Sequence, residues 1–166
     1  YYLNFDLALA SSTTLAASQA MGIDGGSGND YIANNGALHV EADATSIGNG
    51  ATLAVEGVKG IKGAGVAFVE SKLDTRAESW AHGIAGGNGD DTIYNSGNLE
   101  AIADAFANSF SLDIPIQGSV KGIGVNIAFA DTSTITAANA TGITGDDGGD
   151  SLFNSATGAE SLKAHA

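Results

Sequence analysis

The stretch GGNGDDTIY at residues 86–94 occurs three times in this chain in related form. The other copies are GGSGNDYIA at residues 25–33 and GDDGGDSLF at residues 145–153. Each copy begins with glycine, carries an aspartate at its sixth position and has a large aliphatic residue two places later. Glycine permits the left-handed and mirror-β backbone angles that bring carbonyl oxygens toward one point. We therefore interpret each copy as a tight turn between strands.

The aspartates at the sixth position, Asp30, Asp91 and Asp150, add one carboxylate to each turn. Carboxylate and carbonyl oxygens are the hard ligands that suit Ca²⁺. The alternative is an ion-free turn in which Asn and Asp side chains bond their own backbone. Stacked carboxylates without a cation would repel one another, which favours the calcium hypothesis.

The three turns belong to a longer repeat. Gly22, Gly83 and Gly142 precede the turns at intervals of 61 and 59 residues, and an isoleucine follows each of them. Asn34, Asn95 and Asn154 follow the turns at the same intervals. Self-similarity at a fixed distance indicates a repeat architecture. We predict a single repeat array over residues 1–166, with a partial repeat at 1–21, full repeats at 22–82 and 83–141, and a partial repeat at 142–166.

The segments between turns alternate in hydrophobicity. In residues 1–9, alternate positions are Tyr, Leu or Phe and share one face. In residues 38–45 and 99–108, alternate positions form a narrow face of Leu, Val and Ala. Successive side chains of a strand point to opposite faces, so this pattern predicts long strands. A helix is the rival interpretation because alanine is the best helix former. The period of two and the flanking glycines favour strands, and a nearly all-alanine interior would let two sheets approach closely.

A second bend is predicted midway through each repeat, at residues 57–65 and 117–124. Beyond the bends, residues 66–69 and 125–129 are apolar on both faces, which is typical of strands buried on both sides. The outward positions of the preceding segment form a further apolar face, which would be either an interface or the core of a thicker domain. Its residues are Ile102, Phe106, Phe110, Leu112, Ile114 and Ile116.

Two all-β architectures fit the repeat. In a repetitive β-solenoid, a flattened parallel β-helix or β-roll, each coil has about 60 residues and equivalent residues form columns. In the alternative, each repeat is a long antiparallel hairpin and the hairpins stack. The strict matches of Ile23 with Ile84 and Ile143, and of the asparagines that follow the turns, favour the solenoid.

The turns resemble the nonapeptide Gly-Gly-x-Gly-x-Asp-x-(large aliphatic)-x of the calcium-binding repeats-in-toxin (RTX) family of large secreted bacterial proteins. The first two copies fit throughout, whereas the third has Asp146 and Gly149 at positions two and five. The resemblance implies Ca²⁺ shared between turns of successive coils. The implied ligands are Gly25, Ser27, Asn29, Asp30, Gly86, Asn88, Asp90, Asp91, Gly145, Asp147 and Asp150.

Composition excludes several classes of function. The formal charge of −13 opposes binding to nucleic acid or to anionic membranes. The chain has no Cys and therefore no disulfide or thiolate metal site, and no apolar run has the length of a membrane span. The histidines His39, His82 and His165 lack zinc-site spacing. Paired outward carboxylates lack the aromatic platforms of a polysaccharide-active enzyme, so we expect no enzymatic activity.

We expect a structural, calcium-stabilised segment of a large extracellular or cell-surface bacterial adhesin or fibre. Open strand edges at both ends would favour self-association end to end or continuation in a longer array. The alternative is an RTX-type secretion and folding module carried by a secreted enzyme or toxin, which folds when it meets calcium outside the cell. The sequence names no glycan or protein ligand.

Overall fold

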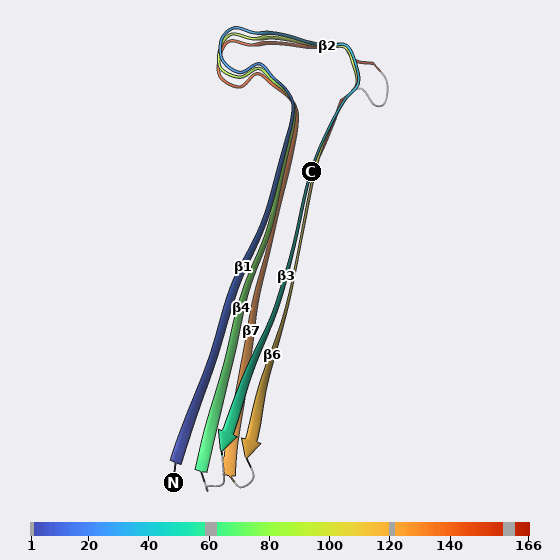
Figure 1. The fold of residues 1–166 in the computed structure, drawn as a ribbon. Coiled ribbons are helices and arrows are strands. Elements are labelled where there is room, and N and C mark those ends of the chain that lie inside the picture. Colours follow the sequence, from blue (N-terminus) through green and yellow to red (C-terminus); the bar gives the residue numbers. More distant parts are fainter. Residues whose placement is uncertain (1, 59–62, 120–121, 158–161) are drawn as a thin grey trace. The chain divides into compact units, whose positions relative to one another are not determined.

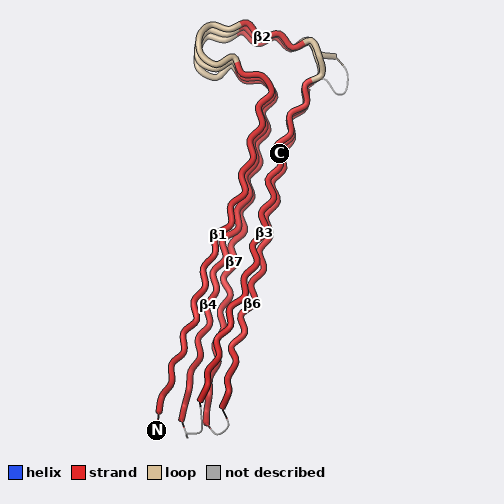
Figure 2. The backbone as a smooth tube through the Cα atoms, in the orientation of Figure 1, coloured by secondary structure: helices blue, strands red, loops and turns tan. Residues whose placement is uncertain are grey.

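The computed structural model describes residues 2–58, 63–119, 122–157 and 162–166, and all regular secondary structure in these ranges is β-strand (Figures 1 and 2). The described part therefore includes no helical segment that could act as a transmembrane span. The centres of the predicted distal bends, residues 59–62 and 120–121, lie outside the described residues, as does Tyr1. The strands are β1 (Tyr2–Asp24), β2 (Tyr31–Asn34), β3 (Leu38–Val58), β4 (Gly63–Ala85), β5 (Thr92–Asn95), β6 (Leu99–Ser119), β7 (Gly122–Thr144), β8 (Ser151–Asn154) and β9 (Leu162–His165).

These strands form three parallel three-stranded sheets, in the orders β1-β4-β7, β2-β5-β8 and β3-β6-β9. Each sheet takes one strand from each successive repeat, and equivalent residues pair. Asn34 pairs with Asn95, and Asn95 pairs with Asn154, along the short sheet. This arrangement confirms the predicted parallel β-solenoid. The alternative of stacked antiparallel hairpins is wrong because β3 and β4 belong to different sheets.

The chain divides into two compact units, and the long strands β1, β3, β4, β6 and β7 each contribute to both, whereas the short strands β2, β5, β8 and β9 belong to unit 2. Unit 1 comprises Tyr1–Leu15, Ser46–Arg76 and Ala107–Ile135. Unit 2 comprises Ala16–Thr45, Ala77–Phe106 and Thr136–Ala166, and it contains the three glycine-rich turns. The two units differ in the chemistry of their interiors.

The interior of unit 2 is small and apolar, as the alternation predicted. One cluster joins Val40, Ala42, Ala81, Ala101 and Ala103 from β3, β4 and β6. Because alanine is short, the sheets approach closely enough for the Ser79 hydroxyl on β4 to donate to the Ala42 carbonyl on β3. A second cluster beside the turns buries larger side chains, namely Ile32, Ile84, Ile93 and Leu99.

The interior of unit 1 is mixed, which corrects the expectation of a nearly all-alanine interior: Ala67, Val69 and Leu73 are buried beside hydroxyl side chains. Ser46 donates to the Thr14 carbonyl over 3.3 Å, and the hydroxyls of Ser109 and Thr134 lie 2.8 Å apart. The hydroxyls of Ser71 and Ser111 also bond across this interior. Thr52, Thr75 and Asp113 place buried side-chain oxygens there without a hydrogen-bond partner. Hydroxyls are nearly as small as methyl groups, so close sheet packing is kept while polarity changes.

The outer faces of unit 1 are more exposed than the sequence predicted. Val66 and Phe68 are half-buried, and Val125 and Phe129 are exposed, so β7 is not buried on both sides. On the apolar face of β6, Ile102 is half-buried and Phe106, Phe110, Leu112, Ile114 and Ile116 are exposed. The physical reason is that burial alternates along β6, so that only its inner face packs against the rest of the described chain.

Close stacking makes some glycines indispensable. A Cβ at Gly83 would stand 2.4 Å from the Gly142 carbonyl oxygen and 2.8 Å from Leu99 Cδ1. We predict that Gly83→Ala lowers the free energy of unfolding by about 1–3 kcal/mol through overpacking. Urea unfolding followed by circular dichroism measures this loss. Gly36→Ala is the matched control because nothing lies within 4 Å of its added Cβ, and an equal loss in both variants would contradict the prediction.

Candidate metal centre

The three glycine-rich turns lie directly over one another in unit 2, as the stacked loops in Figure 2 show. Parallel bridges join Ser27 to Asn88 and Asn88 to Asp147. The Asn88 amide donates to the Gly26 carbonyl and the Gly28 amide donates to the Asn88 carbonyl, both over 2.8 Å. The sequence predicted this column of turns, and in the structure successive turns are hydrogen-bonded to each other as neighbouring strands of a sheet are.

Left-handed backbone angles explain the glycines at positions two and four of each turn. Gly26 and Gly87 have φ of 88° and 98° at position two, and Gly89 has φ of 135° at position four. In the third turn Asp146 stands at position two and adopts φ of 64°. Aspartate tolerates this region better than most residues, so the third turn keeps the shape of the others.

The sixth-position aspartates link successive turns through one carboxylate oxygen. The Asp30 amide donates to Asp91 Oδ1 over 2.8 Å, and the Asp91 amide donates to Asp150 Oδ1 over 2.9 Å. The other oxygens, Oδ2 of Asp30 and of Asp91, are buried and have no hydrogen-bond partner. A buried unpaired carboxylate oxygen is costly, so these atoms are where a cation would be most stabilising.

Each orphaned oxygen and a backbone carbonyl oxygen of the next turn both lie close to the first glycine of the motif. At Gly86, the position of an added Cβ lies 2.6 Å from Asp91 Oδ2 and 2.7 Å from the Gly145 carbonyl oxygen. At Gly25 the same position lies 3.2 Å from Asp30 Oδ2 and 2.3 Å from the Gly86 carbonyl oxygen. A side chain there would fill the space between two hard oxygens. Carboxylate and carbonyl oxygens are donors of the kind that Ca²⁺ accepts, and these two would supply part of the roughly six to eight oxygen ligands that it takes.

The remaining predicted ligands lie on the exposed side of the turns. Asn29 Oδ1 accepts from the Asp90 amide over 3.0 Å, and Asp90 Oδ1 accepts from the Gly149 amide over 2.8 Å. Ser27, Asn88 and Asp147 form the bridging column and are exposed. No three His, Cys, Asp or Glu side chains gather into a metal site within the described ranges. A calcium site at these turns would therefore draw on backbone carbonyls as well as on the sixth-position aspartates.

No family model, curated protein or solved structure matches this chain. The likeness of the turns to RTX nonapeptides therefore rests on the residues of the turns themselves.

A ladder of asparagine side chains borders the turns. Asn34 Nδ2 donates to Asn95 Oδ1 over 2.7 Å, and Asn95 Nδ2 donates to Asn154 Oδ1 over 2.9 Å and to the Gly97 carbonyl over 3.1 Å. Asn95 is only 1% exposed. The sequence placed these residues in one column, but their amide-to-amide bonding emerges only from the register of the sheet.

A second ladder is aromatic and was not anticipated. The rings of Tyr94 and Phe153 are stacked with centroids 4.8 Å apart, and those of Tyr31 and Tyr94 are tilted at 5.5 Å. The signal was present in the sequence, because each turn has an aromatic residue at its seventh or ninth position. Stacked rings add stabilisation beyond their buried area.

His39 forms the centre of a charged cluster on the outer face of β3. Its ring nitrogens lie 3.0 Å from Glu100 Oε2 and 3.4 Å from Glu41 Oε2. Hydrogen bonds that the His39 ring donates to Glu41 and, with a smaller effect, to Glu100 raise the pKa of His39 above its ordinary value of 6.5. Glu100 in turn pairs with Lys163 in the sheet register, so charges alternate across the three strands. His82 lies apart from this cluster and is half-buried, like Trp80.

We predict that Asn95→Ala destabilises the chain by about 1–3 kcal/mol, because the Asn34 amide and the Gly97 carbonyl lose a buried partner. Chemical unfolding measures the change. Asn98→Ala, at an exposed position three residues away, should stay within about 0.5 kcal/mol of the parent. Equal effects in the two variants would show that the ladder adds nothing.

We predict from the same geometry a pH-dependent contribution of His39. Because its folded pKa is raised, its contribution to stability is complete below pH 6.5 and is lost as the pH rises through the folded pKa. An NMR titration of the His39 ring should give a pKa above 6.5 that falls in Glu41→Gln and in Glu100→Gln. Asp104→Asn, which removes an outward acid that does not bond His39, should leave that pKa nearly unchanged.

Proposed function

We propose that this chain is a calcium-stabilised structural segment of a large extracellular bacterial surface protein, an adhesin or fibre built from such coils. The observation that carries the proposal is the pair of buried, unpartnered Oδ2 atoms of Asp30 and Asp91, each beside a carbonyl oxygen of the next turn. Calcium at these positions would join successive coils along one edge.

Charge supports the same function. The chain carries 19 acidic and 6 basic residues, and the aligned turns bring several carboxylates to strand spacing. Divalent cations would relieve this repulsion, and binding that is restricted to the folded state stabilises that state. Calcium is scarce inside cells and abundant outside them, so an extracellular location fits a chain that needs it to fold.

The ladders favour a continuing array over an isolated carrier module. Strand pairing and asparagine bonding repeat from coil to coil, and aromatic rings contact each other between successive turns. Each of these interactions can be extended by one more coil of the same kind, in the parent chain or in a second copy stacked end to end. Bare strand edges recruit further strands.

Thermal unfolding in calcium and in EGTA tests the proposal. We expect calcium to raise the melting temperature, because a site filled at 100 times its Kd adds about 2.7 kcal/mol. Magnesium should raise it less, since Mg²⁺ gives up its waters reluctantly. Asp91→Asn should abolish most of the calcium-dependent rise, because the asparagine amide has no charge and only one oxygen.

Asp104→Asn is the matched control because it removes one exposed carboxylate away from the turns. It should leave the rise nearly intact. A wild-type melting temperature that is insensitive to calcium would eliminate the metal role. If Asp91→Asn and Asp104→Asn lost equal parts of the calcium-dependent rise in melting temperature, calcium would act only by general charge screening.

A further inference from the structure

Unit 1 has an unusual exposed surface on the outer side of β3 and β6. We call it the β3–β6 outer face. It consists of Ile47 and Leu53 on β3 and of Phe110, Leu112, Ile114 and Ile116 on β6, whose exposed fractions run from 43% to 61%. In the described segments 45–53 and 106–116, the outward positions include no charged residue. Contiguous apolar surfaces of this kind mark interaction sites.

The outward direction of these side chains is set by bonds on the inner face. Alternate residues of β6 point inward, where the Ser109 hydroxyl bonds that of Thr134 and the Ser111 hydroxyl bonds that of Ser71. A slip of one residue would exchange the two faces and bury Phe and Ile in place of Ser. The observed register therefore keeps hydroxyls inside and leaves large apolar side chains outside, where something else must cover them.

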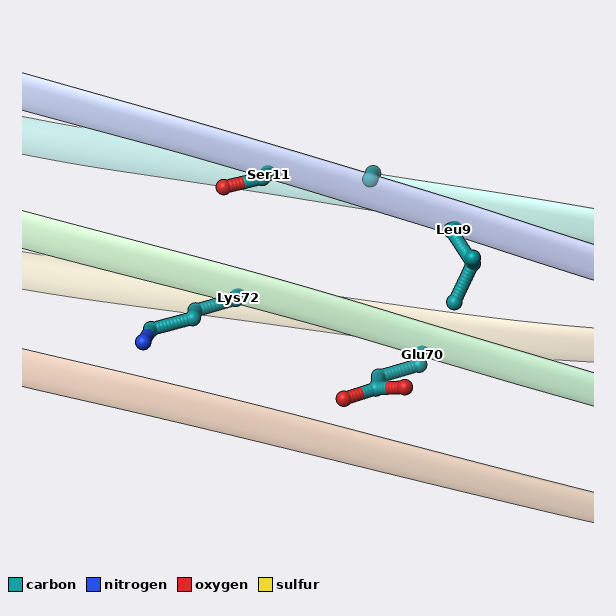
Figure 3. A pocket seen from close by; sticks show the side chains of 5 residues that line it. Leu9, Ser11, Glu70 and Lys72 are labelled. Carbon is teal, nitrogen blue, oxygen red and sulfur yellow. The ribbon is translucent and has the colours of Figure 1, made fainter.

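The opposite outer surface of unit 1 differs in character. There Leu9 and Ser11 on β1 lie beside Glu70 and Lys72 on β4, and all four line one pocket (Figure 3). Charged groups on the central strand of that sheet keep its surface hydrated. That surface also exposes large apolar side chains, among them Phe5, Leu7 and Phe129. The β3–β6 outer face differs from it because its described outward positions carry no charge.

A lipid bilayer is a poor occupant of this face. The charge of −13 opposes approach to anionic lipid.

A second copy of the chain fits better. Two acidic copies repel each other except where their contact surfaces carry no charge, and this face satisfies that condition. Six half-exposed side chains offer on the order of 500 Å² per copy, so a symmetric pair would bury about 1,000 Å², the lower limit for a specific interface. The flat face of one sheet can stack on another at about 10 Å.

We propose that the β3–β6 outer face is a lateral docking surface for the same face of a second copy, related by a twofold axis. The contact is side by side and does not use the strand edges, so it is distinct from end-to-end stacking and does not depend on calcium at the turns. One coil pair gives a weak dimer, and the area grows with every coil added to the array.

Sedimentation equilibrium in calcium-containing buffer tests this pairing. We expect reversible self-association that Leu112→Thr with Ile114→Thr weakens about ten-fold in Kd or more, which corresponds to 1.4 kcal/mol. The control is Leu15→Thr with Ile135→Thr, which removes two exposed apolar side chains from the other outer surface. Melting temperatures near that of the parent show that both variants fold.

A Kd that the Leu112/Ile114 variant leaves within two-fold of wild type, or that the control changes equally, would overturn the proposal. So would flotation of the wild-type chain with phosphatidylcholine vesicles that the Leu112/Ile114 variant abolishes, because lipid would then be the occupant.

Cysteine cross-linking gives a second readout that does not rely on weakened binding. The chain has no cysteine, so Leu112→Cys introduces a single thiol near the centre of the face. Under mild oxidation we expect a disulfide-linked dimer to form at least ten-fold faster with Leu112→Cys than with Ile135→Cys. Equal rates for the two variants would mean random collision and would refute the twofold contact.

Discussion

Parallel backbone pairing between successive coils is the constraint on which the rest of this structure depends. It places each residue on its counterpart 61 or 59 positions away, as the paired asparagines and the bridged turns show. A side chain at a repeated position must therefore pack against its own equivalents in the neighbouring coils, which stack in a column at about 4.8 Å spacing. Glycine, asparagine and stacked aromatic residues meet this requirement, and a column of carboxylates meets it only with hydrogen bonds or a cation.

Within that constraint, the two units solve the packing of facing sheets differently. Unit 2 buries apolar side chains such as Val40 and Ala42, and acidic side chains and His39 lie on its solvent-exposed outer face, as in most sheets with one buried face. Unit 1 buries hydroxyls together with Val69 and Leu73, and it exposes Phe, Leu and Ile on its outer faces. The outer faces of unit 1 differ from each other, since the surface of β1 and β4 carries Glu70 and Lys72 whereas the β3–β6 outer face carries no charge at its described outward positions.

Much of the fold was predictable because the same residues recur along the sequence at nearly constant intervals. The spacing of Gly22, Gly83 and Gly142 gave the coil length, and the alternation after each turn gave the strands. The outward direction of Phe110, Leu112 and Ile114 was also predictable, because it continues the alternation that begins at Leu99. The hydroxyl partners of Ser109 and Ser111 on the opposite sheet were not, because they depend on how the facing sheets are paired.

For the turns, the repeated motif identified the sixth-position aspartates, and the structure showed that the two oxygens of each carboxylate have different surroundings. Oδ1 of Asp91 accepts a hydrogen bond from the backbone amide of the preceding coil, and Oδ1 of Asp150 does the same, so a single nonapeptide could not reveal this bond. The same holds for the amides of Asn34 and Asn95, whose bonding follows from register.

These two ladders share a direction. The Asp30 amide donates to Asp91 and the Asp91 amide to Asp150, while Asn34 donates to Asn95 and Asn95 to Asn154. All four bonds point from an earlier coil to a later one, so their dipoles add along the stacking axis and polarise one another. On the exposed side of the turns the direction is reversed, because the Asp90 amide donates to Asn29 and the Gly149 amide donates to Asp90. The buried and exposed sides of the turn column therefore have opposite polarity, and the direction of the buried ladders distinguishes the two ends of a stack of coils.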